Sequence, residues 1–251
     1  MRIGIIGIGA IGSTLAKKLA ATGHQIKVTS TATPSELALK AKALNAAPAT
    51  IEEVVKDVDV IFLSIPTAAI PKLSKDLFKD IPNTVVIVDT SNYYPFRDGE
   101  IEYLKNGKVE SEWVSEQIGR PVVKAFNNLL AYTLENLGKP KGGENRIAIA
   151  VAGDDQNAKE IVVRLISDTG FDTVDAGNLS QSWRQQPGTP AYCTELNATE
   201  LKQALADGIK EKAAELRDFA ITKLMGLTTP PTHNDIIELN RSLFPKTPKG
   251  V

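Results

Sequence analysis

The sequence has few of the residues that form disulfides or metal centres. It contains one cysteine and two histidines among 251 residues, so no internal disulfide can form and a zinc cluster built on several cysteines is excluded. A single cysteine fits a reducing compartment, and we expect a cytoplasmic protein. We therefore predict no metal site.

An excess of charge and long apolar runs are lacking as well. The formal net charge is −1, which provides no electrostatic footprint for nucleic acid or for an anionic membrane. No apolar run approaches the roughly 18 residues that a membrane-spanning helix needs, and the glycines of the N-terminal run suit a strand and a turn better than a signal peptide. With 42% hydrophobic and 24% charged residues, the composition is that of a soluble enzyme with a small-molecule substrate.

The stretch from Ile3 to Gly12 carries the clearest signal. It reads as an apolar strand that runs into Gly-x-Gly-x-x-Gly at Gly7, Gly9 and Gly12, followed by apolar residues at helical spacing. In a dinucleotide-binding turn the first glycine makes the turn, the second lets the backbone approach a pyrophosphate, and the third lets the helix pack close to the strand. The phosphates then lie on the free N–H groups of the helix. We predict a dinucleotide site; the alternative is a glycine-rich turn that binds nothing.

The end of the second expected strand, residues 25–29, bears on the choice of cofactor. An acid at this place would bind the ribose 2′-OH of NAD, but the chain continues with Ser30 and Thr31, whose hydroxyls could donate to a 2′-phosphate. The nearest acid, Glu36, is expected to fold back on its own helix as the partner of Thr33 in a capping box. The pattern favours NADP over NAD, although no arginine lies in this turn; the alternative is that the hydroxyls only form a turn.

Apolar strands and helices alternate along the rest of the chain. Five further runs have the length of strands: 58–64, 84–88, 121–125, 146–152 and 171–175. The alternation predicts an α/β fold with a doubly wound, mostly parallel Rossmann sheet that is extended by extra strands and carries a C-terminal helical appendage. We expect a dinucleotide-binding domain over residues 1–178, and a loop with helices over residues 179–251.

Three of these strands are expected to deliver polar residues to the carboxyl edge of the sheet, where open α/β sheets bind ligands. The first ends in Ser64-Ile65-Pro66. The chain leaves the sheet there, because a proline cannot continue a central strand. The second leads into Asp89 to Gly99, which is dense in hydroxyl, amide and aromatic groups, and the third ends in Phe126-Asn127-Asn128. For any single residue here, a structural role in a capped turn is the more common alternative.

The C-terminal quarter offers a loop and a long helix. The segment from Ser180 to Cys193 lacks periodicity but is rich in aromatic and amide side chains; long loops are usually functional or disordered, and the aromatic content argues against disorder. We predict that it forms a wall of the substrate site. One helix is expected from Asn197, with Glu200 as its capping-box partner, to about Leu224. Its apolar stripe packs on the sheet or pairs with a second subunit, so a homodimer is one predicted partner.

The candidates for catalysis depend on the hydride acceptor. A flavin-like ring needs no protein acid, whereas a carbonyl or an imine needs a proton donor. Two arginines, Arg97 and Arg184, could clamp an anionic substrate, with a surface ion pair as the alternative. The candidate proton donors are Tyr93, Tyr94, Tyr192 and a water held by Asn127.

Six motifs follow one another in an order that is typical of a known family: Ile3 to Gly12, Ser64 to Pro66, Val88 to Pro95, Val123 to Asn127, Val151 to Asp155, and Gly170-Phe171. The sequence resembles the NADP oxidoreductases that include the coenzyme F420 (deazaflavin)-dependent NADP reductases and many bacterial dinucleotide-binding reductases. The resemblance covers about residues 1–180.

The resemblance implies roles for individual residues. The pyrophosphate would bind along Ile8, Gly9, Ala10 and Ile11, the 2′-phosphate at Ser30 and Thr31, and the nicotinamide side of the cofactor at Ser64-Ile65-Pro66. The complete set of residues that we predict to bind NADP(H) is Gly7, Ile8, Gly9, Ala10, Ile11, Gly12, Ser30, Thr31, Ser64, Ile65, Pro66, Thr90 and Asn92.

These observations predict an NADP(H)-dependent oxidoreductase that transfers a hydride between the nicotinamide and a small acceptor. One alternative is a protein that binds NADP(H) as a sensor or partner without catalysis, since a fold does not fix a function. A deazaflavin-dependent NADP reductase and an NAD-linked dehydrogenase are further alternatives. Neither the substrate nor the direction of reaction follows from the sequence.

Overall fold

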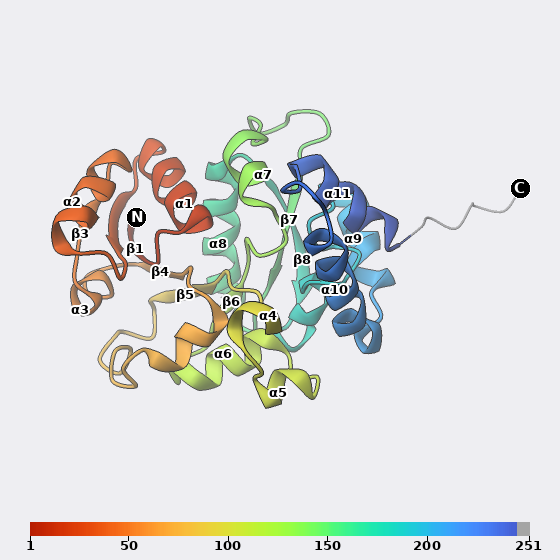
Figure 1. Ribbon diagram of the computed structural model, residues 1–251. Coiled ribbons are helices and arrows are strands. Elements are labelled where there is room, and N and C mark those ends of the chain that lie inside the picture. The colour runs from red at the N-terminus through yellow and green to blue at the C-terminus, as the bar shows by residue number, and fades with distance from the viewer. Residues whose placement is uncertain (245–251) are drawn as a thin grey trace, which may run out of the picture.

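The computed structural model describes residues 1–244, and a sheet of eight strands lies at its centre in the order β3-β2-β1-β4-β5-β6-β7-β8 (Figure 1). Neighbouring strands are parallel except for β6 and β7. The strands are β1 (Arg2–Ile6), β2 (Gln25–Thr29), β3 (Ala47–Pro48), β4 (Val60–Leu63), β5 (Val86–Asp89), β6 (Val123–Lys124), β7 (Ala148–Ala152) and β8 (Asp172–Gly177). This architecture confirms the predicted doubly wound α/β fold and its extension by extra strands.

Helices cover both faces of the sheet. They are α1 (Ala10–Ala21), α2 (Pro34–Ala43), α3 (Ile51–Val54), α4 (Pro95–Asp98), α5 (Glu102–Lys105), α6 (Glu110–Ile118), α7 (Ala131–Asn136), α8 (Gln156–Thr169), α9 (Ala198–Asp207), α10 (Lys210–Met225) and α11 (His233–Ser242), with 3₁₀ helices η1 (Thr67–Lys72) and η2 (Leu179–Gln185). Successive side chains of a strand point to opposite faces. Thus Ile5 and Phe62 pack with α1 and α8 in one apolar cluster, and Ile6 and Ile61 pack with α6 in another.

The capping boxes expected from the sequence form. The Thr33 side chain accepts from the backbone N–H of Glu36, whose carboxylate accepts from the N–H of Thr33. Asn197 and Glu200 make the same reciprocal pair at the start of α9. Each box satisfies two N–H groups that the first turn of a helix leaves without partners. The sequence signal therefore located these helix starts to the residue.

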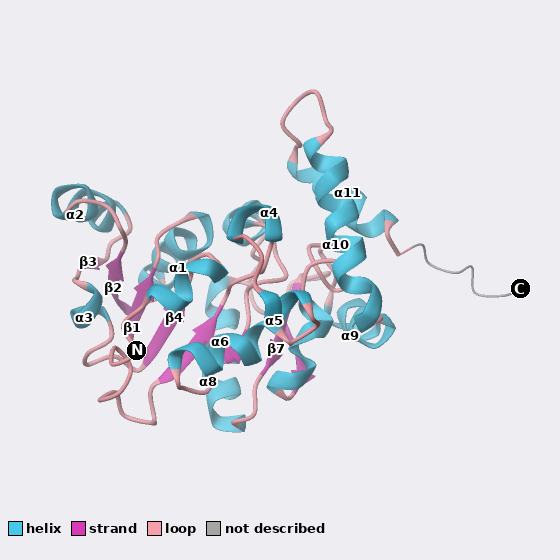
Figure 2. Cartoon of the chain, turned by 60° about the horizontal axis from the view of Figure 1, so that its bottom comes forward, coloured by secondary structure: helices cyan, strands magenta, loops and turns pink. Residues whose placement is uncertain are grey.

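The single long helix expected from Asn197 to Leu224 is wrong, because the structure has two helices that break at Gly208. The backbone there is extended, and a side chain at this position would lie 3.2 Å from the Trp183 ring. The expected apolar stripe is divided as a result. Residues of α9 are buried against β7 and β8, whereas Phe219 of α10 is half-exposed and α10 and α11 extend away from the sheet (Figure 2).

The segment that was expected to be a structureless loop begins with η2, which follows β8 directly. The proposed division of the chain near residue 178 lies at this junction and stays a prediction. No helix within residues 1–244 is long and apolar enough to cross a bilayer. The same residues contain no group of three or more histidine, cysteine, aspartate or glutamate side chains that could hold a metal ion.

Candidate functional site

Two glycines of the N-terminal turn are required by the packing of the protein itself. Gly7 has a φ of +95°, and a Cβ there would lie 2.3 Å from the carbonyl oxygen of Ser64. A Cβ at Gly12 would lie 2.0 Å from the carbonyl oxygen of Gly7. The first glycine thus makes the turn after β1, and the second lets α1 pack against that turn, as the sequence predicts.

The middle glycine is different, because nothing in the protein requires it. Gly9 has an ordinary φ of −68°, and no atom lies within 4 Å of the position that a Cβ would take. It is exposed, and it is the N-cap of α1 without a side-chain cap and without an acidic residue in the first turn. The first N–H groups of a helix have no acceptor within the helix, so open space meets the positive end of a helix of 12 residues.

The end of β2 lies beside this turn, since the N–H of Gly7 donates to the carbonyl oxygen of Thr29 at 2.9 Å. Thr31 is exposed at this end, and Ser30 is half-buried. The Ser30 hydroxyl accepts from the N–H of Ala32 at 3.3 Å, which is the turn-forming role considered for it, and its own proton stays available to a ligand. The two hydroxyls therefore lie next to the glycine turn.

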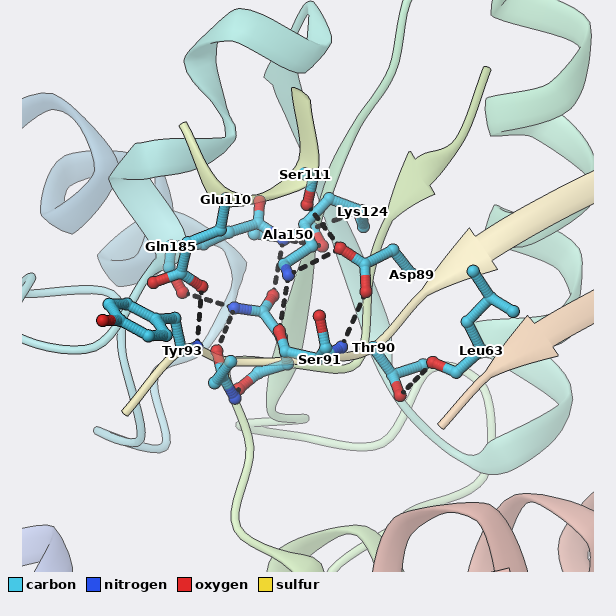
Figure 3. Close-up of polar contacts among 12 residues, drawn as sticks. Leu63, Asp89, Thr90, Ser91, Tyr93, Glu110, Ser111, Lys124, Ala150 and Gln185 are labelled. Atoms are coloured by element: carbon cyan, nitrogen blue, oxygen red, sulfur yellow. Dashed lines mark hydrogen bonds and ion pairs between the residues drawn. The ribbon is translucent and has the colours of Figure 1, made fainter. Parts of the chain in front are cut away.

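The remaining residues predicted to contact the cofactor line the ends of β4 and β5. Ser64 and Ile65 directly abut Gly7. Thr90 donates its hydroxyl to the carbonyl oxygen of Leu63 at 3.0 Å, which joins the two strand ends (Figure 3). The predicted cofactor residues of β1, β4 and β5 thus come together at one edge of the sheet.

Asn127 has a different task from the one expected. Its amide donates to Asn92 Oδ1 at 3.0 Å and to the carbonyl oxygen of Gln185 at 2.7 Å, while its Oδ1 accepts from Gln185 Nε2 at 2.8 Å. Both of its N–H groups are taken and the residue is buried. Asn127 therefore holds Asn92 and η2 in place, and it has no proton left to orient a catalytic water.

The Tyr93 hydroxyl likewise forms hydrogen bonds within the protein. Its hydroxyl donates to the carbonyl oxygen of Gly99 and accepts from the N–H of Ile101, both at 3.0 Å. The ring is buried, and the Arg217 guanidinium of α10 lies over it. The hydroxyl thus closes the loop after β5, so we assign it no proton transfer.

The two arginines considered as substrate clamps are bound to the protein. Arg184 donates to the carbonyl oxygen of Leu205 and to Gln181 Oε1, both at 3.0 Å, and lies over the Trp183 ring. It therefore interacts with the C-terminal end of α9. Arg97 donates to the carbonyl oxygen of Asn92 at 2.6 Å and pairs with Asp98 at 2.8 Å. Each guanidinium thus has partners within the protein, and the role of either one as a substrate clamp stays a prediction.

The remaining candidate, Tyr192, lies against a second tyrosine. The hydroxyls of Tyr94 and Tyr192 share a hydrogen bond of 2.5 Å. Burial raises the pKa of both phenols above their ordinary value of 10.0. Burial also raises the pKa of the adjacent Cys193 thiol to about 12, so that this thiol is no nucleophile near neutral pH.

A buried charge cluster beneath this edge was missed by the sequence reasoning (Figure 3). Lys124 Nζ lies 3.0 Å from Asp89 Oδ2, and neither side chain is exposed. Ser111 donates to the same carboxylate oxygen at 2.6 Å. Nearby, burial raises the pKa of Glu110 from 4.5 to about 7. The one signal for the pair is that Asp89 and Lys124 both close their strands, which the register of β5 and β6 places side by side.

A hollow of about 790 Å³ lies at the other end of the sheet. Its walls include Arg2 and Asp59, which begin or precede strands β1 and β4, so it opens at the amino edge. Open α/β sheets bind their ligands outside the carboxyl ends of the strands. The glycine turn, in contrast, follows the carboxyl end of β1. Within residues 1–244 it is the only strand-to-helix turn with a Gly-x-Gly-x-x-Gly pattern. We therefore place the functional site there.

Comparisons with known proteins identify the family of the chain. A family model described as NADP oxidoreductase, coenzyme F420-dependent, matches residues 2–93. The protein YjhV of Escherichia coli (strain K12) is 37% identical over 124 residues, which are 49% of this chain and 83% of that protein.

Two solved structures show the same fold. Hypothetical protein SMa0349 from Sinorhizobium meliloti is 29% identical with a TM-score of 0.66, over 78% of this chain and 95% of that one. A candidate F420-dependent NADP-reductase from Arthrobacter sp. FB24 is 21% identical with a TM-score of 0.58, over 72% of this chain and 86% of that one. The chain belongs to the family of coenzyme F420-dependent NADP oxidoreductases, and it is a nicotinamide-dinucleotide-dependent oxidoreductase.

Proposed function

We propose that this chain is an NADP(H)-dependent oxidoreductase that transfers a hydride between the nicotinamide and a small-molecule acceptor. The observation that carries the proposal is Gly9. Its φ is one that any residue adopts, and a side chain at this position would meet no protein atom. A ligand that approaches the backbone closely explains a glycine here, whereas the packing of the protein does not.

The residues fit a dinucleotide in three parts. The backbone from Ile8 to Ile11 holds the pyrophosphate at the N-terminal end of α1, because its N–H groups and the helix dipole favour an anion. Ser64 to Pro66, with Thr90 and Asn92, hold the nicotinamide side at the ends of β4 and β5. When bound in its reduced form, the cofactor supplies a hydride; the chain orients it and keeps water from the reacting face.

The choice of NADP over NAD rests on the end of β2. Ser30 and Thr31 offer hydroxyl protons to a 2′-phosphate, and the nearest acid of this segment, Glu36, is turned back onto its own helix. Glu36 Oε2 accepts from the N–H of Thr33 at 3.0 Å and from its hydroxyl at 2.8 Å. These hydrogen bonds lower the pKa of Glu36, so the acid stays charged and bound to its own helix.

A fluorescence titration of the purified protein with NADPH and with NADH tests this proposal. We expect NADPH to bind at least tenfold more tightly, about 1.4 kcal/mol. Replacing the hydroxyl by a carboxylate in Ser30→Asp should remove most of this preference, with NADH affinity nearly unchanged. Equal or tighter binding of NADH by the unmodified protein would contradict the NADP assignment. Binding of neither would contradict the assignment of the whole site.

Three further expectations remain proposals. Residues 1–178 act as the dinucleotide-binding domain, and residues 179–251 supply the acceptor side of the site. The protein acts in the cytoplasm on a small molecule, without nucleic acid or membrane as partner. A homodimer would form through the C-terminal helices, and light scattering in solution measures that state directly.

A further inference from the structure

A pair of tyrosines at the acceptor end of the site is joined through its hydroxyls. Tyr94 follows β5 by five residues, two beyond Asn92, whose amide interlocks with Asn127. Tyr192 precedes Cys193, whose N–H donates to the carbonyl oxygen of Asn128 at 3.0 Å. The segments that carry the two tyrosines therefore lie near the ends of the neighbouring strands β5 and β6, and their hydroxyls are 2.5 Å apart. Both segments lie at the carboxyl edge, where we assign the nicotinamide side of the cofactor.

The segment around Tyr192 is built to present this one side chain. From Pro187 to Thr194 every residue is buried except Tyr192, which keeps partial exposure. The backbone just after it takes left-handed conformations at Cys193 (φ +51°) and Glu195 (φ +54°). Such conformations are costly for residues other than glycine and concentrate at functional sites. The hydrogen bond to Tyr94 holds the Tyr192 hydroxyl in place beside this strained turn.

Tyr94 has the better surroundings for giving up a proton. The Arg97 guanidinium lies over its ring, 5.4 Å from the centroid, and is held there by its contacts with Asn92 and Asp98. Burial raises the pKa of Tyr94, and this cation opposes part of that shift because it favours the phenolate. No comparable cation–ring contact is made by Tyr192 within residues 1–244.

We propose that Tyr94 is the catalytic proton donor, that Tyr192 positions it and returns its proton, and that the acceptor is accordingly an aldehyde or a ketone. This inference rests on the proposed function, because the hydride must come from the reduced nicotinamide.

The step is balanced in atoms and electrons. The acceptor carbon gains a C–H bond from the hydride, which is one proton and two electrons, and the C=O π pair moves onto oxygen. The Tyr94 O–H bond breaks as its proton joins that oxygen, which completes an alcohol. Tyr192 then gives its proton to the Tyr94 phenolate along their hydrogen bond, and solvent restores the Tyr192 proton. The carbonyl is reduced and the nicotinamide is oxidised.

The weak acidity of the tyrosine pair limits which acceptors it can protonate. Burial raises the pKa of the Tyr94 phenol, so it yields a proton only to a strong base. The alkoxide that develops when a carbonyl takes a hydride is such a base. A protonated imine already carries its proton before reduction, and a flavin-like ring needs no protein acid for the hydride step. A carbonyl is the acceptor that requires this donor.

The test compares two kinds of acceptor with NADPH: benzaldehyde and cyclohexanone as carbonyl probes, and riboflavin as a ring that needs no protein acid. Benzaldehyde is chosen because the Phe96 ring lies 5.6 Å from that of Tyr94 and is 61% exposed, which leaves an aromatic surface beside the pair. We expect Tyr94→Phe to lower kcat for benzaldehyde about 100-fold or more. The Kd for NADPH and the thermal unfolding midpoint should remain unchanged.

Tyr192→Phe is the test of the positioning role. We expect a loss of about tenfold in kcat with KM little changed. The solvent deuterium isotope effect on kcat should increase, because returning the proton to Tyr94 becomes slow. Tyr103→Phe is the matched control, since this tyrosine is 67% exposed on α5 and away from the site; it should behave as the unmodified protein in every assay.

A measurement without turnover tests the pair itself. Proton NMR of the protein without cofactor should show a slowly exchanging, low-field hydroxyl resonance. It should vanish in Tyr94→Phe and in Tyr192→Phe and persist in Tyr103→Phe. Absence of this resonance from the unmodified protein, or its survival in either variant of the pair, would overturn the proposal.

Failure of the Tyr94 inference can be distinguished from failure of the proposed oxidoreductase function. Binding of NADPH without reduction of either carbonyl probe overturns the inference, whatever happens with riboflavin. Turnover of riboflavin alone leaves the oxidoreductase function standing. A Tyr94→Phe variant that reduces benzaldehyde at the original rate also overturns the inference. Failure to bind NADPH at all overturns the proposed function and the inference with it.

Discussion

The cofactor half of the carboxyl edge, formed by residues 7–12 with the end of β2, differs in construction from the acceptor half, formed by the ends of β5 and β6 with the segment after η2. The first consists of backbone whose N–H groups point into open space at the start of α1. The second consists of side chains that are bonded to one another, such as Asn127 with Asn92 and Gln185. The first half presents backbone to a ligand, whereas the second is held together by side-chain hydrogen bonds and still contains buried polar atoms without a partner, such as Gln185 Oε1 and Asn128 Oδ1.

Because of this difference, we expect one half to determine the affinity for the cofactor and the other to determine the rate of the reaction. A backbone cradle can bind the invariant phosphates of a dinucleotide without any particular side chain. The acceptor half must instead hold two tyrosine hydroxyls within hydrogen-bonding distance, and small displacements there are costly to the reaction. The buried pair of Asp89 and Lys124 fixes the strand ends on which that half is built. We expect stability to depend most on the acceptor half, and cofactor binding on the other.

Removing the buried cation should have the largest effect. In Lys124→Met, Asp89 keeps its contacts with Ser91 and Ser111 but loses its only cationic partner among the described residues. An uncompensated buried carboxylate is unfavourable, so the free energy of unfolding should fall by about 4 kcal/mol. Urea denaturation at neutral pH measures the change.

The matched control is Lys159→Met. Lys159 also forms an ion pair, but its partner Asp175 is 58% exposed, so water can solvate the carboxylate after the change. We expect a loss below about 1 kcal/mol. Similar losses for the two variants would show that the pair in the acceptor half is no more important than a surface ion pair.

Glu110 should make stability depend on pH. Burial is the main cause that raises its pKa from 4.5 to about 7; Lys124 and Arg217 oppose the shift, and Asp89 adds to it. Between these two values the folded protein holds a proton that the unfolded chain has released, so the free energy of unfolding falls as the pH rises. The difference between the unmodified protein and Glu110→Gln should change by about 3 kcal/mol across that window.

Urea denaturation of both proteins at several pH values from 4 to about 8 checks this expectation. The stabilising contribution of the protonated carboxyl should be fully present at the acid end and lost by the neutral end. Glu110→Gln keeps an oxygen that can accept from the N–H of Tyr93 but cannot titrate in this range. A constant difference between the two proteins would show that Glu110 is solvated or already charged in the folded state.

Substitutions in the glycine turn should lower the free energy of unfolding by a smaller amount, and only at Gly12. In Gly12→Ala the new Cβ would lie 2.0 Å from the Gly7 carbonyl oxygen, and relieving this overlap by moving α1 should cost about 2 kcal/mol of stability. In Gly9→Ala the methyl group meets no protein atom within 4 Å, and the free energy of unfolding should change by less than about 0.5 kcal/mol. Thermal unfolding of the two variants without cofactor gives the comparison.

The cofactor half was predictable from the sequence because its signals are local. The three glycines, the apolar strand before them and the capping boxes all lie within a few residues of what they determine. Seven of the eight strands were located for the same reason, since parallel strands buried on both faces read as continuous apolar runs; the exposed two-residue strand β3 has no such run and was missed. The predicted sheet and its carboxyl-edge segments therefore agree with the structure.

The acceptor half was not predictable, because its contacts join residues far apart in the chain. Asp89 and Lys124 are 35 residues apart, and Tyr94 and Tyr192 are 98 apart. The shift of Asn127 from a water-holding role to a structural one depends on Gln185, which reaches it from η2. At the break between α9 and α10, Gly208 lies against the Trp183 ring from the same 3₁₀ helix. No periodicity or local motif encodes such pairings.

The most direct test of the central claim is a titration of Gly9→Ala with NADPH beside the unmodified protein, followed by cofactor fluorescence. The claim is that Gly9 is a glycine because a dinucleotide lies against it. We predict that NADPH binds the variant at least tenfold more weakly, about 1.4 kcal/mol, while the unfolding temperature without cofactor stays the same. Unchanged affinity in a variant of unchanged stability would contradict the account, since the pyrophosphate would then lie elsewhere.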